Sequence, residues 1–312
     1  MRIWVSVLVT AAVIVPTAAA AIPAAAVVGR PAGQVLEVGG EVSSPTAYTA
    51  AQLAALPQTT VTLTLGRQQV TDTGVLLETL VADAAPTYPT SLLNTKNELL
   101  RVTVTVRGAG RGAVTFAAGE LDPGFGNHPA LLALTQDGRP IPRGPELVVP
   151  GDRSPVRSVP RVSAVTVGIA TAPATTAAPS AGSPVEIIDG RRVVALSATR
   201  LARLPEETLK VSFEGPGGVQ ADTETGPALL EVLALAGIRP TLNTWVAAVG
   251  DDNYVATVTP AEQFAGGRPL QLSLIENGAA LPQPRLATDG DVKGGRYVSG
   301  MVDIYVGVGP AS

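Results

Sequence analysis

Arginine is concentrated in one short part of an otherwise acidic chain. Between positions 139 and 161 there are five arginines and two acids: Arg139, Arg143, Arg153, Arg157 and Arg161 against Glu146 and Asp152. A guanidinium group pairs with phosphate or carboxylate through two parallel hydrogen bonds. Arg153, Arg157 and Arg161 are therefore candidate ligands for a small anion or a pterin. The alternative is a solvated loop that binds nothing, because surface arginines are common.

A second basic region near the end of the chain offers matching candidates. Lys293 and Arg296 lie beside Gly290, Gly294 and Gly295. If the first region binds an anion, replacing Arg157 with Ala should leave folding intact and weaken that binding.

Two acidic clusters could supply oxygen ligands to calcium. They are Asp251, Asp252 and Glu262, and Asp289, Asp291 and Asp303. Neither has the EF-hand spacing, and Asp-rich turns also form without an ion. Asp251 and Tyr254 remain as ligand candidates. Tyr254 and Trp245 also offer ring faces to a sugar, with core packing as the alternative for Trp245.

Residue counts exclude several chemistries. There is no cysteine, which excludes a thiolate nucleophile, a cysteine-ligated metal and lipoprotein acylation. His128 is the single histidine, so a site with two histidines is excluded, and no Gly-x-Ser-x-Gly motif supplies a nucleophilic serine. Asn127-His128-Pro129 predicts a turn before a strand.

The overall charge argues against nucleic acid as a partner. The 312 residues carry a formal net charge of −4 with a pI near 5.2, and aromatic residues make up only 4%. Gly108 to Gly112 is glycine-rich, but a strand follows it where a phosphate-binding loop needs a helix.

Alternating and helical patterns predict the elements that would position these residues. Helices are expected at 49–56, 76–85, 197–204 and 228–236, with Thr49 as a cap. Strands are expected at 61–65, 101–107, 113–117, 131–135, 146–149, 159–167, 208–213 and 298–306, and near Ala247, Val255 and Leu272. The glycines at 108–112 make a hairpin of 101–107 and 113–117.

The order of these elements occurs twice, which predicts a tandem duplication. Residues 53–57 match 201–205, residues 113–120 match 255–262, and residues 157–159 match 296–298. The offset changes only at turns, where insertions are tolerated. We expect one repeat at 34–169, a linker rich in Pro, Ala and Thr at 170–184, and a second repeat at 185–309.

The first 26 residues have the pattern of a secretion signal. Arg2 precedes an apolar run at 3–15, and alanines at 18–20 and 24–26 offer cleavage sites. The alternative is a membrane anchor, but a bilayer span needs about 20 apolar residues. We therefore expect a secreted protein with no membrane span in the mature chain. The 33 glycines and 27 prolines, with abundant alanine, are typical of a high-GC bacterial genome.

Three stretches resemble the molybdopterin-binding domain of the sulfite oxidase superfamily. They are 48–57, the helix start at 73–80, and the closing segment at 138–142, 147–151 and 156–159, to which the second repeat adds 251–256. The resemblance implies an α+β fold, with two tandem copies of a mixed-sheet domain. Redox members of that superfamily hold molybdenum through a cysteine thiolate, and this chain has no cysteine. Both copies are therefore interpreted as degenerate, with no catalytic residue.

Three function hypotheses follow. The first is an exported, non-catalytic binding or scaffold protein with no cofactor, whose partner is a small anion or another exported protein. The second is a molybdopterin-dependent oxidoreductase with an atypical or partner-supplied metal centre. The third is a calcium-stabilised cell-wall or adhesion module.

Overall fold

A computed structural model of the chain describes residues 36–65, 68–92, 96–109, 112–172, 182–215 and 217–310. The predicted signal at 1–26 and most of the predicted linker at 170–184 lie outside these residues.

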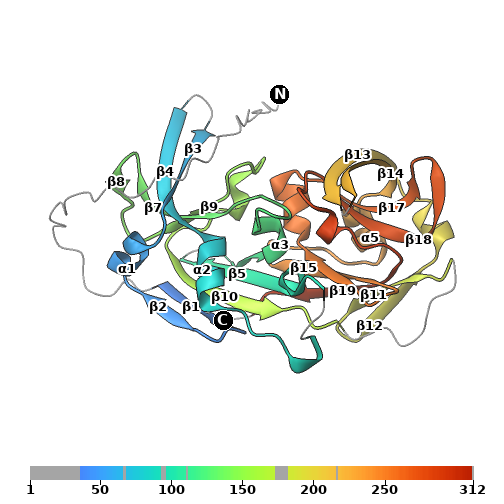
Figure 1. Cartoon of the computed structure of the whole chain (residues 1–312), viewed down its shortest axis with the longest axis horizontal. Helices are drawn as coiled ribbons and strands as arrows, with labels where there is room; N and C mark the ends of the chain where they lie inside the picture. The colour runs from blue at the N-terminus through green and yellow to red at the C-terminus, as the bar shows by residue number, and fades with distance from the viewer. Residues whose placement is uncertain are drawn as a thin grey trace.

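Two β-rich halves lie side by side, the N-terminal half in blue and green and the C-terminal half in yellow and red (Figure 1). Each half has two sheets. In the first half the sheet orders are β2-β1-β10-β5-β6 and β3-β4-β7-β8, with β9 paired to β7. In the second half they are β12-β11-β19-β15-β16 and β13-β14-β17-β18.

The strands of the first half are β1 (Leu36–Gly40), β2 (Thr46–Tyr48), β3 (Thr59–Leu65), β4 (Gln68–Leu76), β5 (Val102–Gly108), β6 (Val114–Ala117), β7 (Leu131–Gln136), β8 (Arg139–Pro140), β9 (Glu146–Val148) and β10 (Val162–Ile169). Those of the second half are β11 (Val185–Asp189), β12 (Arg192–Leu196), β13 (Glu206–Gly215), β14 (Gly218–Pro227), β15 (Thr244–Gly250), β16 (Val255–Val258), β17 (Leu270–Glu276), β18 (Ala279–Thr288) and β19 (Met301–Val308).

The α-helices are α1 (Ala50–Ala55), α2 (Leu77–Ala84), α3 (Ala118–Leu121), α4 (Ala198–Leu201) and α5 (Leu229–Leu235). Short 3₁₀ turns are η1 (Thr90–Leu92), η2 (Glu98–Arg101), η3 (Pro155–Arg157) and η5 (Gly294–Arg296), and η4 (Glu262–Gly266) is a π-helical turn.

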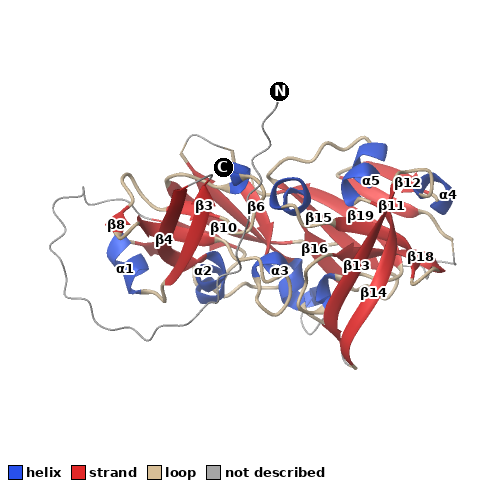
Figure 2. Cartoon of the chain, turned by 90° about the horizontal axis from the view of Figure 1, so that it is seen from above, coloured by secondary structure: helices blue, strands red, loops and turns tan. Residues whose placement is uncertain are grey.

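The α+β prediction is wrong, because the fold is β-rich. Of the residues that the structure describes, 49% are in strands and 19% in helices, and Figure 2 shows how short the helices are. The sequence patterns did not reveal β4, β14 or β18. Thr73-Gly74 was interpreted as a helix start, yet both residues lie inside β4. Pro282 and Pro284 argue against a strand, but β18 is the last strand of its sheet, where proline is tolerated.

Several local predictions are confirmed. Thr49 caps α1, and its backbone N–H and hydroxyl are both paired with the side chain of Gln52. Strands β5 and β6 form the predicted antiparallel hairpin. These elements depend on signals within a few residues of each other.

The connections are alike in the two halves. In the first half β1 pairs parallel with β10, and in the second β11 pairs parallel with β19. Both β10 and β19 then pair antiparallel with the next strand, β5 or β15. The shared order is a topological observation, and descent from a duplication stays a prediction.

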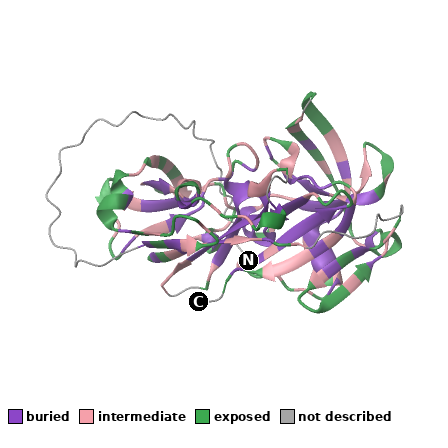
Figure 3. Cartoon of the chain, turned by 60° about the horizontal axis from the view of Figure 1, so that its bottom comes forward, coloured by how far each residue is buried: buried purple, intermediate pink, exposed green. Residues whose placement is uncertain are grey.

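The halves are packed tightly against each other. Leu100, from η2 of the first half, is fully buried in the apolar cluster of the second half. The backbone N–H of Thr115 donates to Leu242 O at 2.9 Å, and that of Val292 donates to Phe125 O at 2.7 Å. Figure 3 shows buried segments running through the middle of the molecule, where the halves meet.

In the described part of the chain, no helix is both long and apolar enough to cross a membrane.

Candidate functional site

The first part of the site is a buried arginine held by two acids. The short helix α3 directly follows the fully buried strand β6, which places Glu120 inside the protein with no exposed surface. Arg157, also fully buried, reaches it from η3, with Nη1 2.6 Å from Glu120 Oε1. Its Nε and Nη2 donate to the two oxygens of Asp152 at 2.8 and 2.6 Å.

His128 lies against the same two acids. Its Nδ1 is 3.4 Å from Glu120 Oε1 and its Nε2 is 3.3 Å from Asp152 Oδ1. The backbone N–H of His128 donates to Glu120 O at 2.9 Å, which fixes the loop before β7. The turn lies at 123–126, just before the predicted residues 127–129, which lead into β7. The His128 side chain is buried, at 6% exposure.

The second half contains an equivalent arrangement. Arg296 donates to both oxygens of Glu262 at 2.8 Å and, through Nε, to Asp291 Oδ2 at 2.9 Å. Arg268 takes the place that His128 has in the first half. It lies 3.4 Å from Glu262 and 3.3 Å from Asp291, and its backbone N–H donates to Glu262 O.

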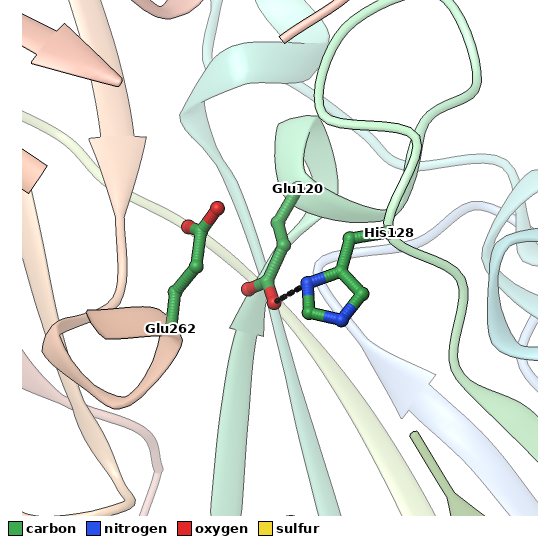
Figure 4. A group of neighbouring side chains, drawn as sticks. All are labelled: Glu120, His128 and Glu262. Carbon is green, nitrogen blue, oxygen red and sulfur yellow. Dashed lines mark ion pairs between the residues drawn. The ribbon is translucent and has the colours of Figure 1, made fainter. Parts of the chain in front are cut away.

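The two arrangements meet at the junction. Each ion pair lies within one half, and hydrogen bonds join the two. We call the two arrangements together the ion network. Its members are Glu120, Asp152, His128, Arg157, Glu262, Asp291, Arg268 and Arg296. Thr259 of the second half donates to Glu120 Oε2 at 3.4 Å, and Arg268 Nη1 donates to Gly126 O at 2.8 Å. Figure 4 shows Glu262 facing Glu120 from the opposite half, with His128 on the far side of Glu120.

The charges inside this network stabilise one another. Burial alone would raise the pKa of Glu120, but the Arg157 and His128 side chains outweigh burial and lower that pKa to about 2. Burial alone would lower the pKa of Arg157, and Glu120 and Asp152 raise it instead. Asp291 and Glu262 raise the pKa of Arg296 in the same way, against the effect of burial. Asp152 differs, because there burial outweighs Arg157 and raises its pKa.

The structure separates the five basic candidates into two groups. Arg157 and Arg296 are fully buried and paired with acids. Arg153, Arg161 and Lys293 are exposed. The backbone N–H of Arg153 donates to Gly266 O of the second half at 3.3 Å, so this exposed arginine lies next to the junction.

The two remaining candidates, Asp251 and Tyr254, lie outside the ion network. Asp251 is exposed, and its backbone N–H donates to Gly300 O. Tyr254 is half-buried, with a hydroxyl that accepts from Asn97 Nδ2 at 2.9 Å and donates to the Gly295 carbonyl. Burial raises the pKa of Tyr254. Because Asn97 belongs to the first half and Gly295 to the second, Tyr254 connects the halves.

The predicted calcium clusters are not assembled as the sequence suggested. Glu262 and Asp291 belong to the buried network, whereas Asp251 and Asp252 are exposed. Within the described ranges, one group of three acid or histidine side chains is close enough to hold an ion: Glu120, His128 and Glu262, with ligand atoms within 4.8 Å of one another.

Glu120, His128 and Arg268 were missed as functional candidates. The repeat alignment contained a signal for Glu120, because it matches Glu262 and each is an acid that follows an apolar strand. Arg268 had no comparable signal, because a histidine stands in its place in the first half.

The two buried arginines, Arg157 and Arg296, do not fit the pterin that the family resemblance implies. Every guanidinium nitrogen of Arg157 and Arg296 donates to a carboxylate. With no cysteine in the chain, the metal ligand of that family is missing as well.

Distant neighbours of this chain occur among solved structures. The sulfane dehydrogenase SoxCD from Paracoccus pantotrophus is 17% identical, with a TM-score of 0.34. The match covers 83% of this chain but only 63% of the SoxCD chain. No family model and no curated protein matches the sequence.

Proposed function

We propose that this chain is an exported, non-catalytic binding or scaffold protein whose two halves act as one rigid body. The observation that carries this proposal is the closed ion network. Its two buried arginines, Arg157 and Arg296, were candidate anion ligands, but each is paired with acids of its own half. Hydrogen bonds from Thr259 to Glu120 and from Arg268 to Gly126 then join the two halves.

One hollow of the surface lies apart from the ion network. A hollow of about 400 Å³ lies over β1, β2 and β10, lined by residues such as Gly39, Ala47 and Ala164. Its lining includes none of the network residues. An active site needs polar groups that converge on a cavity, and the network does not face this one.

The exposed cations Arg153, Arg161 and Lys293 are the proposed contacts for a small anion. Inorganic phosphate is the probe, with binding followed by amide chemical shifts. We expect Arg153→Ala to weaken phosphate binding several-fold, since one charge-assisted hydrogen bond is lost. Arg139→Ala, an exposed arginine on β8, is the matched control and should bind as the wild type does. Equal binding by all three proteins would remove Arg153 from the proposal.

The oxidoreductase alternative is tested directly. Protein exported by a molybdenum-competent host is analysed for molybdenum and, after acid release, for pterin fluorescence. We expect neither. Stoichiometric molybdenum together with pterin would overturn the non-catalytic proposal.

A further inference from the structure

The ion network has one guanidinium group fewer in its first half than in its second. In the second half, Glu262 and Asp291 face two guanidinium groups, those of Arg296 and Arg268. In the first half, Glu120 and Asp152 face one guanidinium and the imidazole of His128. Unlike a guanidinium, an imidazole nitrogen can offer a lone pair to a metal.

The orientation of His128 suits metal binding. Its Nε2 lies 3.3 Å from Asp152 Oδ1, while its Nδ1 points toward Glu120 (Figure 4). Nδ1 is buried without a hydrogen-bond partner, in a side chain only 8% exposed. Metal-binding histidines typically direct their second nitrogen at a carboxylate, as Nε2 does here.

Two carboxylates complete the group. Ligand atoms of Glu120, His128 and Glu262 all lie within 4.8 Å of one another. Nitrogen and oxygen ligands lie about 2.0–2.2 Å from a tetrahedral zinc, which places them about 3.5 Å from one another. The ligand atoms would therefore have to move closer by up to about 1.3 Å to close the site. Arg157 donates to Glu120 Oε1, the oxygen that lies against His128 Nδ1, and Arg296 donates to both oxygens of Glu262. Each carboxylate thus has a charged outer partner, as metal ligands commonly do, and would bind the ion through its remaining lone pairs.

We propose that Glu120, His128 and Glu262 bind one divalent transition-metal ion at the junction of the two halves. The ligand set is nitrogen and oxygen only, which suits zinc or manganese. Because Glu120 comes from the first half and Glu262 from the second, the ion stabilises their association. The proposal is independent of any anion bound at the surface.

The single histidine makes the test direct. In tag-free protein stripped with a chelator, the only imidazole resonances in the NMR spectrum are those of His128. Zn²⁺ should shift these resonances and saturate at one equivalent, and Mn²⁺ should broaden them. Imidazole resonances that respond to neither ion would overturn the proposal and leave His128 as an ion-pair partner of Glu120 and Asp152.

Variants provide the second readout. His128→Gln removes the nitrogen ligand and should lower Zn²⁺ affinity at least about 10-fold by calorimetry. It should also abolish the rise in unfolding temperature that Zn²⁺ gives the wild type. Asp189→Asn, an exposed acid outside the network, is the control and should keep both effects. Equal affinity in His128→Gln would contradict the assignment, and if that variant does not fold, the wild-type NMR titration decides.

Discussion

At the scale of single residues, burial decides what an arginine does. Arg157 has the residue type and local charge of an anion ligand, yet it has no exposed surface and donates to both Glu120 and Asp152. Arg153, four positions earlier, is exposed. The sequence alone does not separate them, because their difference arises from acids brought in by the fold.

Replacing Arg157 with Ala should therefore destabilise the protein, contrary to the expectation from sequence. The change leaves Glu120 and Asp152 buried without their cation, which typically costs about 3–5 kcal/mol. Urea unfolding measures the loss. Arg139→Ala, at an exposed position, should stay within about 0.5 kcal/mol of the wild type. A loss below about 1 kcal/mol for Arg157→Ala would show that the ion network contributes little to stability.

The lowered pKa of Glu120 predicts a specific loss of stability in acid. A carboxyl whose folded pKa lies below its unfolded value stabilises the protein above the unfolded pKa, about 4.3 for Glu. That contribution is lost as the pH falls toward the folded value of about 2. The free energy of unfolding should thus fall between about pH 4.5 and 2, and the slope should be shallower in Glu120→Gln. Glu41→Gln, at an exposed position, should leave the slope unchanged.

At the scale of elements, the sequence predicts what local signals determine. The cap of α1, the apolar face of α2 and the β5–β6 hairpin all depend on neighbours in the chain, and all are present. Strands β14 and β18 were not predicted, although each forms a hairpin with the strand directly before it. Half of the residues of β14 are polar and its first four are exposed, and β18 contains two prolines, which are tolerated at a sheet edge.

The candidate site was also predicted only in part from the sequence. Glu262 and Arg296 were both candidates from sequence, but for different ligands, calcium for one and an anion for the other. Only the fold shows that each binds the other, with Arg296 Nη1 2.8 Å from Glu262 Oε2. Glu120 and His128 lie eight positions apart in the sequence. The candidate metal site also needs Glu262 of the opposite half, and Asp152 lies against the second nitrogen of His128.

Strand β4 requires glycine at position 74. A Cβ there would lie 2.0 Å from the carbonyl oxygen of Leu132, and one at Gly226 of β14 would lie 2.1 Å from that of Leu272. Gly74→Ala and Gly226→Ala should each cost about 1–3 kcal/mol, because a backbone must move. Gly39→Ala, in β1 with nothing within 4 Å, is the control and should change the unfolding temperature little. Similar unfolding temperatures for all three variants would contradict this packing.

At the scale of the whole molecule, the junction joins two cores. Leu100 of the first half is part of the apolar cluster that contains Leu229 and Val246 of the second. Thr115 Oγ1 is 2.6 Å from Asn243 Oδ1, again across the junction. Tyr254 and the ion network add polar contacts between the halves. Each half therefore buries both apolar and polar groups of the other.

Because the halves share an apolar cluster and polar contacts, we predict a single unfolding transition. Calorimetry of the wild type should give one peak whose calorimetric and van't Hoff enthalpies agree, because unfolding one half exposes apolar surface of the other. Leu100→Ala should lower stability by about 2–5 kcal/mol and move the whole peak, although the residue lies in the sequence of the first half. Val193→Ala, at a side chain that is 54% exposed, should leave the peak in place. Two separate peaks, or a Leu100→Ala effect confined to one of them, would mean that the halves unfold independently and that the junction does not couple them.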